Sequence, residues 1–98
     1  MFEFKNEKEA RKIASSYHPG SLLEVICPPS EGKFVAWEKS HYVSFPDGTI
    51  FMVISCVCEY NKNSRWTGRL VFDLLSTDKI VQVYANKHPK VYFKEIRG

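Results

Sequence analysis

Residues 49–60, TIFMVISCVCEY, constrain the fold more than any other stretch, because apolar side chains occupy both alternating positions. Successive side chains of a strand point to opposite faces, so such a strand needs cover on both sides. We therefore expect a central strand. Its longest uncharged apolar run has 10 residues, short of the roughly 20 that a membrane-spanning helix needs. One face is expected to carry Ile50, Met52, Ile54, Cys56 and Cys58, and the other Phe51, Val53 and Val57.

Residues 6–17 predict a single helix. Asn6 is a suitable N-cap, and Glu9 follows three residues later, as in a capping box. The sequence HPG at 18–20 then ends the helix, since proline disfavours helical geometry before it and glycine permits the turn. A narrow apolar stripe, typical of a helix that covers a flatter element, is formed by Ala10, Ile13, Ala14 and Tyr17.

The rest of the chain predicts strands. In residues 33–45 we place Val35, Trp37, Val43 and Phe45 on one face of a single strand with a bulge or bend near residues 38–40. The sequence FPDGT at 45–49 predicts a hairpin turn, with Gly48 left-handed and the flanking strands paired. The expected strands cover residues 21–27, 33–45, 49–60, 66–75, 79–85 and 90–96.

One helix followed by a run of strands predicts an α+β fold. We expect a single domain over residues 1–98, with the N-terminal helix packed on a twisted, mainly antiparallel sheet of five or six strands. One helix is a small cover for so aromatic a sheet, so a homodimer is also considered. The charged N-terminus lacks the apolar core of a signal peptide and the cysteine count is odd, which indicates a cytoplasmic protein without membrane contact.

Three cysteines raise the question of a metal or redox site. Cys56 and Cys58 share one face of a strand about 7 Å apart, too far and too parallel for an easy disulfide. Zinc knuckles prefer Cys-x-x-Cys on turns, and a reactive thiol needs a neighbouring cation or helix N-terminus. Core packing is therefore the favoured role, also for Cys27. We expect no metal and no cofactor, assign no catalytic residue, and consider an enzyme the less favoured class.

The charge is unevenly distributed. Residues 1–59 have a net charge of −2, whereas residues 60–98 have a net charge of +5. Aromatic side chains alternate with the basic ones in this second half. Trp, Tyr and Arg dominate protein-interface hot spots, but basic and aromatic groups together also bind nucleic acids, and lysines can simply solvate a sheet. The candidate partner-binding residues are Arg65, Trp66, Arg69, Tyr84, Lys87, Lys90 and Tyr92.

These features favour a small regulatory or inhibitory module that binds a macromolecule through its basic-aromatic sheet surface. The preferred partner is a protein with an acidic face, which the aromatic side chains would anchor and the basic ones would orient. RNA or DNA is the alternative partner, and binding would then weaken steeply with salt because phosphate contacts release counterions.

Residues 68–92, GRLVFDLLSTDKIVQVYANKHPKVY, resemble the last two strands of RelE-like bacterial toxins over about a quarter of the chain. The resemblance implies a small basic ribonuclease in which Arg69, Lys90 and Tyr92 contact or act on the RNA backbone. That family begins with two helices, whereas this sequence predicts one. The resemblance therefore supplies the enzyme alternative.

Overall fold

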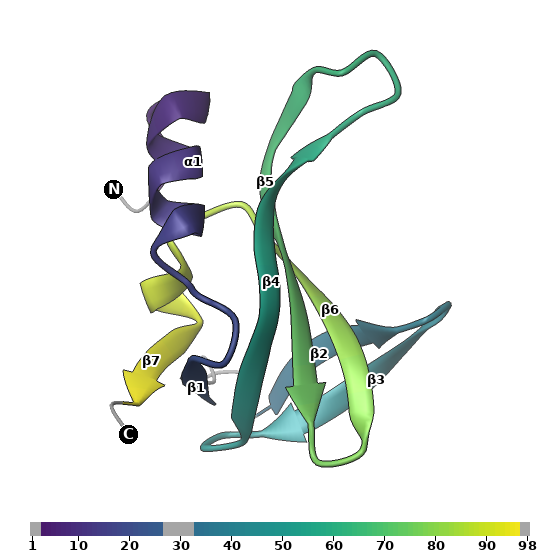
Figure 1. Ribbon diagram of the computed structural model, residues 1–98. Helices are drawn as coiled ribbons and strands as arrows, with labels where there is room; N and C mark the ends of the chain where they lie inside the picture. The colour runs from purple at the N-terminus through teal and green to yellow at the C-terminus, as the bar shows by residue number, and fades with distance from the viewer. Residues whose placement is uncertain (1–2, 27–32, 97–98) are drawn as a thin grey trace.

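The computed structural model describes residues 3–26 and 33–96 (Figure 1). It has one α-helix, α1 (Glu7–Ser15), a short 3-10 helix, η1 (Pro89–Val91), and a seven-stranded antiparallel sheet. The strands are β1 (Leu22–Val25), β2 (Lys33–Glu38), β3 (His41–Pro46), β4 (Ile50–Tyr60), β5 (Trp66–Ser76), β6 (Lys79–Ala85) and β7 (Phe93–Ile96). The predicted α+β class is confirmed, but the sheet has seven strands instead of five or six.

Helix α1 begins where the sequence indicates. The Asn6 side chain accepts a hydrogen bond from the Glu9 amide at 2.9 Å, which satisfies one of the unpaired N–H groups of the first turn. The apolar stripe faces the sheet, because Ala10, Ala14 and Tyr17 are buried. The helix packs against β4 and β5. The face of the sheet that α1 covers is called the inner face below, and the opposite face is the outer face.

The seventh strand comes from a turn at a place where we predicted only a bulge or bend. Residues 33–45 are not one strand, because the chain reverses at Lys39 and Ser40 and pairs Glu38 with His41. Lys39 adopts the left-handed conformation, with φ of 57°, which closes this short hairpin. The reversal also changes the faces: Phe34 and Phe45 lie on the inner face, whereas Trp37 is paired with Tyr42 on the outer face.

The strand order is β3-β2-β6-β5-β4-β1-β7. The FPDGT turn forms with Gly48 at φ of 85°, but the strands on either side of it, β3 and β4, are not neighbours, so that prediction is wrong. The physical reason is a competing partner, since the Gly48 amide bonds to the Val25 carbonyl at 3.0 Å and the Val25 amide to the Thr49 carbonyl at 2.9 Å. The turn is therefore a corner that docks on the end of β1.

Strand β4 contains an irregularity that changes which side chains face inward. Its register against β5 shifts between Val53 and Ser55, as a β-bulge does. Phe51 and Val53 are buried before the shift, and Cys58 is buried after it. The cysteines therefore share a face with Phe51 and Val53, and not with Ile50 and Met52 as predicted.

The sheet curls around its inner face, so that strands far apart in the order meet there (Figure 1). The Phe34 ring of β2 lies 5.4 Å from the Phe93 ring of β7, measured between ring centroids. Phe45 of β3 lies 4.9 Å from Phe51 of β4. This phenylalanine-rich core, together with α1, fills the curl. No helix among residues 3–26 and 33–96 is long and apolar enough to cross a membrane.

The outer face has an exposed apolar row. Met52 of β4 is in register with Leu75 of β5, which is in register with Ile80 of β6. Ile80 is 61% exposed and Met52 36%. No second copy of the chain is part of the structure, and the homodimer stays a prediction.

Candidate functional site

The outer face is hollowed where β2 meets β6. The two strands are joined through the pair Trp37 and Gln82. Two adjoining hollows of about 230 Å³ and 400 Å³ open there. We call the two hollows together the aromatic hollow. The residues that line both of them are Trp37, Tyr42, Arg69, Gln82 and Tyr84. The smaller hollow also reaches Phe34, Val35, Val83 and Tyr92, and the larger one Lys39.

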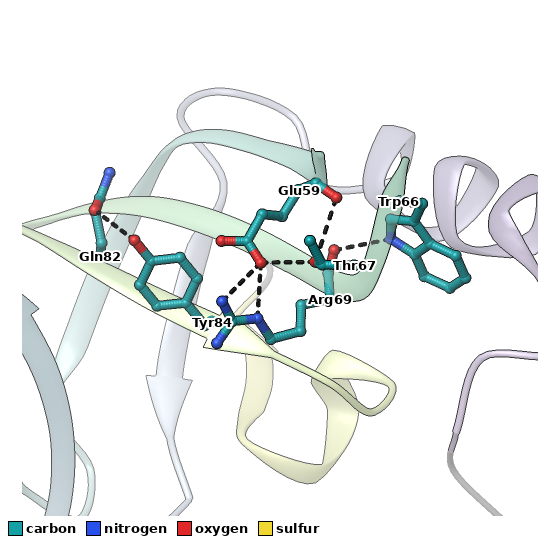
Figure 2. A network of polar contacts seen from close by, with 6 residues as sticks. All are labelled: Glu59, Trp66, Thr67, Arg69, Gln82 and Tyr84. Atoms are coloured by element: carbon teal, nitrogen blue, oxygen red, sulfur yellow. Dashed lines mark hydrogen bonds and ion pairs between the residues drawn. The ribbon is translucent and has the colours of Figure 1, made fainter. Parts of the chain in front are cut away.

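Arg69 of β5 is held at the centre of this site (Figure 2). Its Nε and Nη2 atoms donate to Glu59 Oε1 at 2.8 Å and 2.7 Å. Its guanidinium carbon lies 4.6 Å from the centroid of the Tyr84 ring, a cation–π contact. Arg69 is thus fixed between a carboxylate and an aromatic ring, which lowers the entropy it would lose on binding a partner.

The carboxylate of Glu59 holds Arg69 in its ionised form. Burial alone would raise its pKa, but hydrogen bonds from Thr67 and Arg69 outweigh burial, and the pKa lies below its ordinary value. The Thr67 hydroxyl donates to Glu59 Oε1 at 2.7 Å. Glu59 is therefore ionised at neutral pH and keeps Arg69 in place.

A chain of side-chain hydrogen bonds runs from this site across the outer face. The Tyr84 hydroxyl donates to Gln82 Oε1 at 3.2 Å, and Gln82 Nε2 donates to Asp73 Oδ1 at 2.9 Å. Ser55 Oγ donates to Asp73 Oδ2 at 3.2 Å. The chain orients the Tyr84 ring against Arg69, because it ties the hydroxyl to β5 and β4 through cross-strand neighbours. Figure 2 shows its Tyr84–Gln82 bond.

Trp37 and Tyr42 form the other wall of the hollow. Their ring centroids lie 3.8 Å apart, with an interplanar angle of 37°. Tyr42 is 62% exposed. Large rigid rings that stay exposed are a costly surface for an isolated protein, and they are enriched at interface hot spots.

The structure brings some of the predicted residues together and separates the others. Arg69, Tyr84 and Tyr92 line one hollow. Tyr92 is half-buried, its pKa is raised by burial, and its hydroxyl donates to Asn86 Oδ1 at 3.0 Å. Trp66 contributes only indirectly, since its indole N–H donates to the Arg69 carbonyl at 3.0 Å while its ring packs on Phe4.

The remaining predicted residues lie outside the hollow. Arg65 is in the β4–β5 turn, where its amide donates to Asn61 Oδ1 at 3.1 Å. Lys87 bridges to Glu3 through the backbone. Lys90 lines a different hollow, beside His88 and η1, so the three positions of the toxin resemblance do not converge on one place.

Sequence analysis missed Trp37, Tyr42, Gln82 and Glu59 as site residues. Trp37 was placed on the wrong face because the turn at Lys39 was not recognised. Two signals could have revealed the turn. The segment 33–45 is longer than an average strand, and its apolar and polar residues alternate poorly.

The cysteines do not form a second site. Burial, followed by the neighbouring Cys58, raises the pKa of Cys56 to about 12, and burial also raises that of Cys58. Both are free thiols on the inner face. Among residues 3–26 and 33–96 no cluster of three or more His, Cys, Asp or Glu side chains could hold a metal ion. Cys27 lies outside the described residues.

Comparison of the chain with protein-family models, with curated proteins and with solved structures finds no match.

Proposed function

We propose that this chain is a non-enzymatic regulatory or inhibitory module that binds a protein partner through the aromatic hollow. The single observation that supports this most is the fixed Arg69 side chain beside the Trp37–Tyr42 ring pair, of which Tyr42 is exposed. Arginine and large aromatic side chains, held in place before binding, are the features of an interface hot spot.

A protein fits this surface better than a nucleic acid. Glu59 already occupies the Nε and Nη2 atoms of Arg69, so a phosphate and a carboxylate would both have to use Nη1, and Arg69 alone does not separate the two classes of partner. Arg65, Lys87 and Lys90 lie outside the hollow and offer no continuous basic track. Lys39 at the rim and the net charge of +3 still favour a partner with an acidic face.

A photo-crosslinking amino acid placed at Tyr42 tests the proposal in cells that express the chain. We expect one protein to crosslink from position 42, and the crosslink to survive nuclease treatment. The matched control is the same amino acid at Ile80, which has nearly the same exposed fraction, 61% against 62%, but lies outside the hollow.

Equal crosslinking from positions 42 and 80 would contradict a specific surface. Recovery of RNA or DNA instead of protein would favour the nucleic-acid alternative, including the ribonuclease. That alternative has one supporting observation, since Arg69 and Tyr92 do line one hollow. It predicts cleavage that is lost in Tyr92→Phe.

A further inference from the structure

The smaller hollow lies where β2 and β6 part. Trp37 and Gln82 are paired, and the same antiparallel register would go on to pair Ala36 with Val83 and Val35 with Tyr84, but neither pair forms among the described residues. Val35 and Tyr84 line the hollow instead, together with the buried core residues Phe34 and Val83. Beyond Trp37 and Gln82 the described residues of β2 and β6 are not paired with each other, and the hollow between them reaches the core.

The side chains around this opening present hydrogen-bond donors. The Trp37 indole N–H and the Tyr42 hydroxyl make no side-chain hydrogen bond to any described residue. Glu59 occupies Nε and Nη2 of Arg69, which leaves Nη1 for a ligand. The Lys39 ammonium stands at the rim of the larger hollow, and no Asp or Glu is among the residues that line either one.

An extended peptide matches this combination. Its backbone can pair with an open strand edge, and its carbonyl oxygens can accept hydrogen bonds from Trp37 and Tyr42. A carboxylate side chain complements Arg69 Nη1 and Lys39. An apolar side chain can enter the opening toward Phe34 and Val83. A nucleic acid can use the aromatic rings and the cations, but it cannot pair with a strand edge.

We infer that the partner inserts an extended peptide segment bearing a carboxylate side chain between β2 and β6, in the aromatic hollow. The inference rests on the proposed function, because it names the part of the partner that this same site would take.

A random heptapeptide display library, selected on the immobilised full chain, tests the inference without knowledge of the partner. We expect the selected peptides to be enriched in Asp or Glu relative to the library, and the enrichment to disappear on Tyr42→Ala. Ile80→Ala is the control of equal exposure and should select the same peptides as the unchanged protein.

The two tryptophans then report the binding place in a ¹⁵N–¹H correlation spectrum. The Trp37 indole signal, assigned with Trp37→Phe, should shift saturably with a selected peptide, whereas the Trp66 signal should stay, because that N–H is bonded to the Arg69 carbonyl. Replacing the peptide's Asp or Glu by its amide should weaken binding about tenfold, the size of one charge-assisted hydrogen bond. N-methylation along one edge of the peptide should abolish binding.

Peptides that N-methylation leaves unaffected, or a library that enriches nothing beyond the Tyr42→Ala control, would overturn the extended segment. A shift of the Trp37 signal by oligo(dT), with no shift by the selected peptides, would also overturn the extended segment. A protein that still crosslinks from position 42 in those cases preserves the docking function and rejects only the peptide mode. Loss of both results rejects both proposals.

Discussion

The two faces of this sheet are built from the same strands but differ in burial and in the contacts of their side chains. On the inner face, Phe72 contacts the rings of Tyr17 and Phe93, and the buried side chains of the described residues pack into one core cluster. On the outer face, Tyr42 and Ile80 are more than half exposed, and polar side chains hold one another in place. The inner face accounts for the fold, whereas the outer face keeps a rigid arrangement that the fold does not require.

The largest expected difference is in stability. Phe72→Ala should lower the free energy of unfolding by about 3–5 kcal/mol, because it removes a fully buried ring and leaves a cavity. Tyr42→Ala on the outer face should cost under about 1 kcal/mol, since it loses one exposed cross-strand pair. Urea unfolding followed by circular dichroism measures both. If the two variants lost equal stability, the contrast between the faces would be wrong.

The second prediction concerns alkaline pH. Burial, assisted by Glu95, raises the pKa of Tyr17 from 10.0 to about 12, and burial raises that of Cys56 from 9.0 to about 12. The fold favours the neutral forms, so their contribution is complete below pH 9 and is lost as the pH rises toward 12. The protein should therefore lose stability between pH 9 and 12.

The variant Tyr17→Phe, Cys56→Ser isolates this effect, because neither new side chain titrates in that window. Its urea midpoint should fall less between pH 8 and pH 10.5 than that of the unchanged protein. If the urea midpoints of the variant and the unchanged protein fell equally between pH 8 and pH 10.5, these inner-face groups would not control the loss of stability at alkaline pH.

The smallest expected effect is on the outer face. A double-mutant cycle with Glu59→Gln and Arg69→Met should give a coupling of about 0.5–1 kcal/mol at pH 7, a modest value because Arg69 is 45% exposed. The pKa of Glu59 is lowered, so the coupling is present above its ordinary value of 4.5 and is lost as the pH falls through the lowered pKa. A coupling that did not fall with pH over the acid range in which the protein stays folded would mean that charge does not hold Arg69.

Local rules predicted the elements well where one signal dominated. The N-cap at Asn6 and the alternation of Leu70, Phe72 and Leu74 in β5 agree with the structure. The left-handed turn at Lys39 has no glycine or asparagine to mark it, so a strand was missed and Trp37 was assigned to the wrong face. The bulge in β4 likewise has no marker, since either apolar phase of that strand could face the core.

The candidate site could be predicted only in part for the same reason. Arg69, Tyr84 and Tyr92 were found from the alternation of basic and aromatic residues, and they line one hollow. Glu59 was not, because its importance depends on pairing with Arg69, ten residues away across the β4–β5 turn. The FPDGT corner shows the same limit: a turn is a local property, but the partner of the strand after it is not.

The single pair between β2 and β6 has a consequence for the order in which the protein assembles. Strands β4, β5 and β6 follow one another in the chain and pair with their sequence neighbours, which favours early formation. The β2–β3 hairpin joins them through Trp37 and Gln82 and so is expected to dock late and to open first. In native-state hydrogen exchange its amides should exchange before those of β5. The hollow would then be the part of the molecule that opens at the lowest free energy, and a ligand bound there would slow the exchange of a whole hairpin.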